Sequence, residues 1–324
     1  MTVTARRGTE LRCRNWRAEA LLRLLENVLE VGERPEELVV YASIGKAAKD
    51  WDAYRRIVDA LQHLGEDQTL VLQTGRPVAV LNTHAAAPMV VSAVNNTVGN
   101  WATEERFYSR LAEHKTIWGG LTAAAWQYIG RQGVLGGTYE LLRAALEKHF
   151  REPAAPHRWV LTAGLGGMGS SQPISARMLE LSTLVVEADP AKLAKLRAAG
   201  GIDLVIDDLD GALATISAAI TERRPVAVGL LGNAADVFPA VVASGARPDI
   251  VTDQTAAHDA RYGYLPSGYT LESWAEARET DPEQVERDAR ASMAAQVRAM
   301  LALRQRGSVV FENGNNLRVQ ASHV

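Results

Sequence analysis

The chain has 324 residues, of which 47% are hydrophobic, so it is long enough to bury two cores of ordinary domain size. Its 35 basic and 38 acidic residues leave a net charge of -3, which gives no broad attraction to nucleic acid or to an anionic membrane. The single cysteine, Cys13, excludes an internal disulfide and a cysteine-based zinc site. The N-terminus has no apolar signal region and no stretch is apolar enough to span a membrane, so we expect a soluble cytoplasmic protein with a small ligand.

The first part of the chain is expected to form an α/β domain over residues 1–150. Apolar residues at three- and four-residue steps predict an amphipathic helix over 15–31. Short β-rich runs predict strands over 38–41, 69–73 and 78–81, each of which leads into a polar or small-residue loop. A helix is expected over 47–64, after the first strand. Six glycines between residues 118 and 139 favour a loop-rich binding surface over a regular helix. A helix that ends near Phe150 is expected after it.

The rest of the chain alternates between strand-like and helix-like segments, which predicts a doubly wound parallel sheet. The expected strands are 159–163, 183–187, 204–206, 226–230 and 250–252, and the helices between them are 172–181, 190–199, 209–222 and 235–244. A longer helix is expected over 282–306, with a proline in its first turn. With a boundary in the polar segment 151–156, we expect a Rossmann-like domain at 151–270. Residues 271–324 should then form a C-terminal helix and a return segment toward the core domain.

The strongest motif is the glycine-rich segment Gly164-Leu165-Gly166-Gly167-Met168-Gly169. A buried-strand pattern precedes it, and an acid, Glu187, closes the next strand about twenty residues on, as in dinucleotide-binding folds. Gly164 would allow a tight turn, Gly166 would let backbone N–H groups approach a pyrophosphate, and Gly169 would let helix pack on strand. Glu187 would accept ribose hydroxyls, which favours NAD over NADP. The alternative is a loop whose glycines serve its conformation alone.

Two further polar segments follow predicted strands of the same sheet. Residues 231–235 include Asn233, and residues 252–259 include His258. Both could line the crevice outside the carboxyl ends of the strands. Asn233 is equally compatible with a turn or a helix cap, and His258 with a capping or core imidazole, because no second ligand stands at metal spacing. We expect no metal site, and the sequence contains no Walker or serine-hydrolase motif.

Several segments together resemble the urocanase (urocanate hydratase) family, along essentially the whole chain. The most specific are LTAGLGGMG at 161–169 and VTDQT followed by AHD within 251–259. Further matching segments are 7–13, 45–48, 75–78, 232–235, 263–266 and 314–316.

The resemblance implies a tightly held NAD that acts as an electrophile. In that family the imidazole ring of urocanate adds to the nicotinamide, water adds, and the product leaves with no net redox change. The family's cofactor contacts would fall on Gly167, Met168, Gly169, Glu187, Asn233, Ala234, Gln254, Thr255, Ala256, Ala257, His258, Tyr264 and Leu265. On the substrate side, Tyr41 and Thr122 match positions that face urocanate, which makes them the candidate catalytic residues.

The sequence also departs from the family pattern. Ala42-Ser43 replace a glycine pair, and Gly120 stands where the family has a cofactor-contacting glutamine. The arginine after the ribose acid is Lys192 here, which keeps the charge and loses the bidentate fork. Asn313 replaces a tyrosine, and the pattern is disturbed over 93–101. The family's C-terminal portion, with its catalytic cysteine and carboxylate-binding arginine, has no counterpart in these residues, and Cys13 does not match that cysteine.

These features favour a urocanase-like hydro-lyase that acts on urocanate or a related heteroaryl acrylate. We expect a homo-oligomer, or a hetero-oligomer in which another chain supplies the C-terminal portion. One alternative is a related lyase with an altered substrate, motivated by Ala42-Ser43 and Gly120. Two others are a non-catalytic NAD-binding or regulatory subunit and an NAD-dependent dehydrogenase, which the glycine pattern alone does not exclude.

Overall fold

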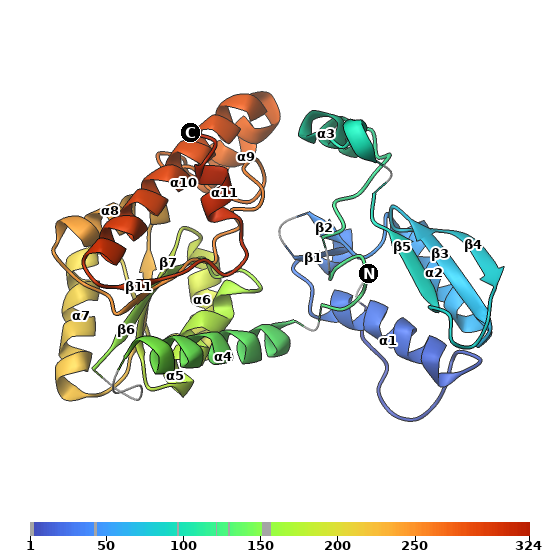
Figure 1. Cartoon of the computed structure of the whole chain (residues 1–324), viewed down its shortest axis with the longest axis horizontal. Coiled ribbons are helices and arrows are strands. Elements are labelled where there is room, and N and C mark those ends of the chain that lie inside the picture. Colours follow the sequence, from blue (N-terminus) through green and yellow to red (C-terminus); the bar gives the residue numbers. More distant parts are fainter. Residues whose placement is uncertain (1–2, 42–43, 96, 121, 129, 151–156) are drawn as a thin grey trace. The chain divides into compact units, whose positions relative to one another are not determined.

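The computed structural model describes residues 3–41, 44–95, 97–120, 122–128, 130–150 and 157–324. The expected boundary segment 151–156 and the Ala42-Ser43 pair lie outside the described residues, as does one position of the 93–101 stretch. Two compact units make up the chain, Met1–Gly130 and Arg131–Val324 (Figure 1). Each unit is a mixed α/β structure with its own sheet.

The first unit is built on a small sheet of strand order β4-β3-β5. Its elements are α1 (Trp16–Glu30), η1 (Pro35–Glu37), β1 (Val39–Tyr41), β2 (Gly45–Lys46), α2 (Trp51–His63), β3 (Gln68–Gln73), β4 (Arg76–Asn82), β5 (Val90–Ala93), η2 (Gly99–Trp101) and α3 (Glu104–Ala112). The side chain of Asn15 caps α1 by accepting the N–H of Ala18, and Leu22, Leu25 and Leu29 form its buried face. β3 and β4 are an antiparallel hairpin, whereas β3 and β5 are parallel.

The second unit contains a six-stranded sheet of order β11-β10-β6-β7-β9-β8, in which every pair is parallel. Its strands are β6 (Trp159–Ala163), β7 (Ser182–Glu187), β8 (Leu204–Ile206), β9 (Ala227–Leu231), β10 (Ile250–Val251) and β11 (Val309–Val310). The helices are α4 (Arg131–His149), η3 (Gly169–Ser171), α5 (Gln172–Met178), α6 (Pro190–Ala198), α7 (Leu209–Glu222), α8 (Ala234–Ala243), α9 (Leu271–Thr280), α10 (Pro282–Gln305) and α11 (Leu317–Ala321). The predicted Rossmann-like sheet is confirmed.

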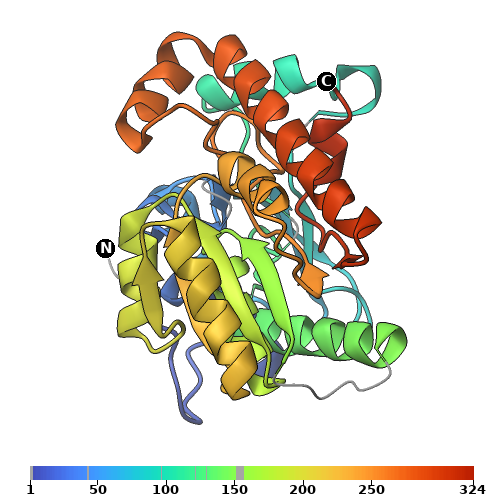
Figure 2. The ribbon, with the colours of Figure 1, turned by 90° about the vertical axis from the view of Figure 1, so that its left-hand side faces the viewer.

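Helices cover both faces of this sheet (Figures 1 and 2). Successive strand residues point to opposite faces, so each face contributes apolar side chains to a core of its own. Leu161 and Leu184 belong to one core with residues of α7, α8 and α10. Val160 packs with residues of α4 and α5, and Val185 packs with residues of α6. The sheet is therefore doubly wound.

The expectation of a loop-rich segment over 118–139 is wrong for its second half, because α4 begins at Arg131 and runs through Gly136 and Gly137. A Cβ at either glycine would meet nothing within 4 Å, so neither is required by close packing. Leu142 and Leu146 are buried against Val160 and Ile250, and this burial outweighs the poor helix propensity of the glycines. α4 thus belongs to the second unit, which begins before residue 151.

The C-terminal helix was predicted within one residue of its observed end. Met293, Met300 and Leu303 of α10 lie in the same core as α8, and β11 joins the edge of the parallel sheet. The expected return toward the N-terminal domain stays a prediction. No helix in the described part of the chain combines the length and apolar character needed to cross a bilayer.

Candidate dinucleotide site

The candidate site lies at the carboxyl edge of the parallel sheet. β6 has β7 on one side and β10 on the other, so the chain leaves β6 in one direction and later returns on the opposite side. Loops that follow the two neighbours diverge at such a point and leave a crevice between them. The glycine loop follows β6, Glu187 ends β7, Asn233 follows β9, and the turn 252–258 follows β10. The fold thus brings the predicted cofactor residues of the second unit to one edge.

Two glycines close the loop against its neighbours. Gly164 has φ +86°, and a Cβ there would lie 2.6 Å from the carbonyl carbon of Gln254 and 2.7 Å from the nitrogen of Thr255. A Cβ on Gly169 would overlap the carbonyl oxygen of Gly164. The backbone of the loop therefore packs directly on the turn after β10, which only glycine permits.

The middle of the loop is open. A Cβ on Gly166 would meet nothing within 4 Å, and Gly167 and Met168 are exposed. Within the described residues, the structure gives the backbone N–H groups of Gly166, Gly167 and Met168 no hydrogen-bond acceptor. Three adjacent free donors beside a bare Cα surface suit an anionic group such as a pyrophosphate.

Glu187 joins the loop to the next strand. One carboxylate oxygen accepts the N–H of Leu165 at 2.6 Å, and the other accepts the N–H of Asp189 at 3.0 Å. The residue is 8% exposed, so its side chain is fixed at the crevice. Each oxygen keeps a second lone pair, with which a ribose hydroxyl could bond. Lys192 follows in the first turn of α6, half-buried.

Asn233 is a helix cap, one of the two structural roles that the sequence left open, and it also anchors a distant loop. Its Oδ1 accepts the N–H of Ala235 at 2.9 Å, and its Nδ2 donates to the carbonyl of Leu265 at 2.9 Å. Ala234 and Tyr264 are buried beside it. The amide thus holds two of the predicted contact segments together.

The turn after β10 is tightly folded. The N–H of Ala257 donates to Thr255, and a Cβ on Gly263 would overlap the carbonyl oxygen of Ala256. Gln254 donates from Nε2 to the carbonyl of Asn313 at 3.0 Å. His258 is half-buried at the end of the turn. No group of three or more His, Cys, Asp or Glu side chains among the described residues could hold a metal ion.

Three buried residues behind this turn, Asp253, Gln296 and Asn315, are not among the predicted site residues. Asp253 is 0% exposed and accepts hydrogen bonds from Gln296 at 2.8 Å and from Asn315. Tyr264 donates to Oε1 of Gln296 at 2.8 Å. One signal for Gln296 exists in the sequence: it is a polar residue at helical spacing from the apolar Met293 and Met300.

In the first unit the structure brings Tyr41 and Thr122 together, because the N–H of Thr122 donates to the Tyr41 hydroxyl at 3.3 Å. Tyr41 also packs edge-on against Trp118, with ring centroids 6.2 Å apart. Gly120 has φ +58°, and a Cβ there would lie 2.5 Å from the Tyr41 hydroxyl oxygen. In this chain the hydroxyl therefore fills the space that a side chain at position 120 would need.

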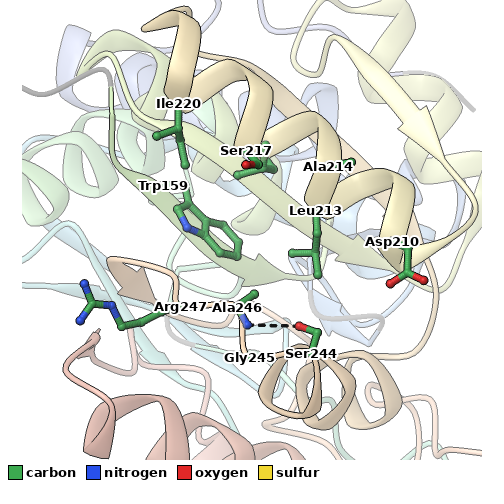
Figure 3. A pocket seen from close by; sticks show the side chains of 11 residues that line it. Trp159, Asp210, Leu213, Ala214, Ser217, Ile220, Ser244, Gly245, Ala246 and Arg247 are labelled. Carbon is green, nitrogen blue, oxygen red and sulfur yellow. Dashed lines mark hydrogen bonds between the residues drawn. The ribbon is translucent and has the colours of Figure 1, made fainter.

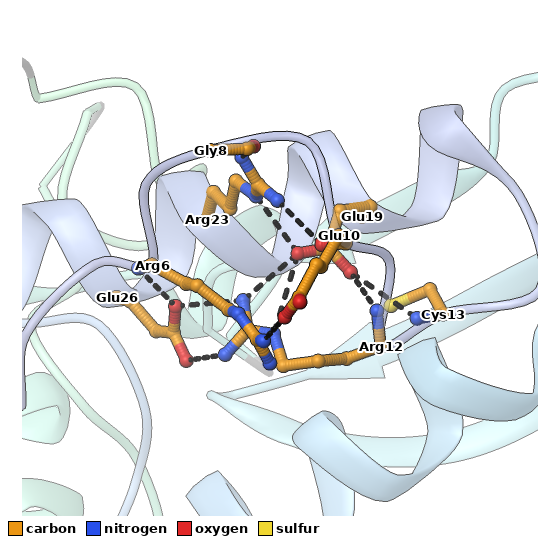
Figure 4. Close-up of polar contacts among 8 residues, drawn as sticks. All are labelled: Arg6, Gly8, Glu10, Arg12, Cys13, Glu19, Arg23 and Glu26. Carbon is orange, nitrogen blue, oxygen red and sulfur yellow. Dashed lines mark hydrogen bonds and ion pairs between the residues drawn. The ribbon is translucent and has the colours of Figure 1, made fainter.

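An ion-pair network fixes the N-terminal segment on α1 (Figure 4). Arg12 pairs with Glu19 and Glu26, and Arg23 pairs with Glu19 at 2.8 Å. Burial opposes ionisation of Glu19, but hydrogen bonds from Arg23, Arg12 and backbone N–H groups outweigh it and lower its pKa to about 2. Cys13 is buried, and burial with the nearby Glu19 charge raises the pKa of its thiol to about 11.

A separate hollow of about 570 Å³ lies between α7 and the turn that follows α8 (Figure 3). Trp159, the first residue of β6, contributes to its wall together with Leu213 and Ile220 of α7 and the exposed Arg247. The lining includes none of the glycine loop, Glu187, Asn233 or the turn after β10, so this hollow is distinct from the candidate site.

Two family models match the chain. The urocanase N-terminal domain matches residues 3–127, and the urocanase Rossmann-like domain matches residues 130–324. The chain belongs to the urocanase family. The two matched ranges coincide closely with the two structural units, and membership points to a lyase function like that of urocanate hydratase.

Proposed function

We propose that this urocanase-family chain binds NAD at the carboxyl edge of its parallel sheet and serves hydration of urocanate or a related heteroaryl acrylate. The glycine loop carries the proposal. Gly164 and Gly169 have no room for a side chain, whereas a Cβ at Gly166 would meet nothing and Gly167 and Met168 are exposed. The N–H groups of Gly166, Gly167 and Met168 have no acceptor among the described residues. If the glycines served the conformation of the loop alone, an open and exposed middle between two tightly packed ends would have no explanation.

The remaining residues of the edge fit the same ligand. The pyrophosphate would lie on the N–H groups of the loop, and one ribose would bond to Glu187. A 2′-phosphate would meet the Glu187 carboxylate, so NAD is favoured over NADP. Asn233 and the turn 254–258 would complete the wall, with Lys192 near the ribose acid.

When bound, NAD would supply the electrophile that the chemistry of this family needs. The chain's own candidates for the substrate side are Tyr41 and Thr122. The Tyr41 hydroxyl accepts from the Thr122 amide, which leaves its own proton available to donate to a substrate atom. Cys13 is not a candidate nucleophile, because a buried thiol with a pKa of about 11 stays protonated at neutral pH.

Calorimetric titration of the purified chain with NAD and with NADP tests the cofactor assignment. We expect NAD to bind more tightly than NADP, and Glu187→Gln to reduce that preference. Asp207→Asn is a matched control, since Asp207 is an exposed acid of the same unit. Tighter binding of NADP, or no binding of either nucleotide, would contradict the assignment.

The activity is tested separately, by loss of the ultraviolet absorbance of urocanate in the presence of NAD. Turnover supports the hydro-lyase. The inert environment of Cys13 favours one other candidate, a non-catalytic NAD-binding subunit. That candidate predicts NAD binding with no loss of absorbance.

A further inference from the structure

Asp253 is the centre of a buried polar network behind the turn that follows β10. Its Oδ1 accepts from Nε2 of Gln296 at 2.8 Å. Its Oδ2 accepts from the Thr255 hydroxyl at 2.6 Å, from the Thr255 N–H at 3.2 Å, and from Nδ2 of Asn315. The side chain is 0% exposed, so a ligand in solution has no access to it.

The donors come from separate parts of the chain. Gln296, also 0% exposed, belongs to α10, and its Oε1 accepts from the Tyr264 hydroxyl. Asn315 lies between β11 and α11 and donates a second time, to the carbonyl of Thr255 at 3.0 Å. The carboxylate therefore ties two segments, α10 and the segment around Asn315, to one turn, and Gln296 adds Tyr264 to the network.

The opposite side of that turn faces the glycine loop. Gly164 approaches the backbone of Gln254 and Thr255 so closely that a Cβ has no room. A displacement of the turn by a few tenths of an ångström would thus reach the loop and the crevice. Asp253 fixes the turn from behind, and Gly164 contacts it in front.

We propose that Asp253 is a positioning residue, which sets the nucleotide affinity of the glycine loop and the turn 254–258 by tying that turn to α10 and Asn315. The inference rests on the proposed NAD site. A carboxylate suits this place because it accepts on both oxygens. An amide would direct an NH₂ group at one set of donors.

Gln296→Met tests the inference, because methionine fills similar space and donates no hydrogen bond. Gln296 is not itself a proposed cofactor contact, although its Oε1 accepts from one of them, Tyr264. Tyr269→Phe is the matched control: it removes another tyrosine hydrogen bond to α10, the 2.8 Å bond to Asp288, outside the network. Two readouts are taken on the full chain, the Kd of NAD and amide hydrogen exchange at Thr255, relative to exchange at the core residue Val185.

We expect Gln296→Met to raise the Kd of NAD about tenfold, since a buried acceptor loses its partner. Exchange at Thr255 should become faster while that at Val185 stays unchanged, and Tyr269→Phe should alter neither readout. Unchanged affinity and exchange in Gln296→Met would overturn the inference, as would equal effects in the control. If the unsubstituted chain binds no NAD but exchange at Thr255 still responds, the NAD site fails and the coupling of the turn to α10 stands.

Discussion

Substitution by alanine at two glycines of the same loop should affect different properties: stability at Gly164 and nucleotide affinity at Gly166. In Gly164→Ala, a Cβ must accept a φ of +86° and lie 2.7 Å from the nitrogen of Thr255. The left-handed backbone costs about 1 kcal/mol and the overpacking against backbone about 2 kcal/mol, so we expect a loss near 3 kcal/mol in unfolding free energy. For a unit of this size that corresponds to a fall in Tm of roughly 6–12 °C.

In Gly166→Ala, the Cβ enters open space, so unfolding free energy should change by less than about 0.5 kcal/mol. The same methyl group would stand where a pyrophosphate must approach the loop, and the Kd of NAD should rise about tenfold or more. Urea unfolding and calorimetric titration of both variants supply the measurements. Equal destabilisation by the two substitutions, or full NAD affinity in Gly166→Ala, would refute the assignment of a closed and an open side to this loop.

Three further predictions concern ionisable groups. Burial raises the pKa of Asp253 from 3.8 to about 6. As pH rises from about 4 to about 6, the unfolded state ionises before the folded state does, so the unfolding free energy should fall with rising pH. Asp253→Asn should remove that component in urea titrations taken at a series of pH values. Glu19 has a pKa lowered to about 2, so its contribution is present above about pH 5 and lost as pH falls toward 2. Arg12→Ala should lower stability at neutral pH and make the acid fall shallower; an unchanged acid profile would contradict the ion-pair account. Tyr41→Phe should abolish any urocanate turnover yet cost only about 1 kcal/mol in unfolding free energy, because the half-buried Thr122 amide loses one acceptor.

Much of the second unit was predictable because its signals are local. The strand before Gly164 and the acid at Glu187 are separated by one helix, so their spacing alone places them on neighbouring parallel strands. The strand order was not predictable, since it depends on which strands, distant in the sequence, pair with one another. The end of helix α4 near residue 150 was predicted, but its start was missed for a related reason: the glycines dominate the local pattern there, whereas the burial of Leu142 and Leu146 depends on distant strands.

The network behind the turn shows what local patterns omit at a binding site. Asp253 meets Gln296 across 43 residues and Asn315 across 62, so no motif of ordinary length contains the set. The turn itself carries the specific VTDQT match, but a match identifies residues without saying which of them face a ligand. Gln296 offered the one physical signal, a polar side chain on the apolar face of α10. A buried amide on such a face must find a partner, and the partner to expect is another buried polar group, such as the carboxylate at the end of β10. From the sequence alone, that requirement singles out Gln296 as a residue with a buried polar partner, but it does not identify the partner.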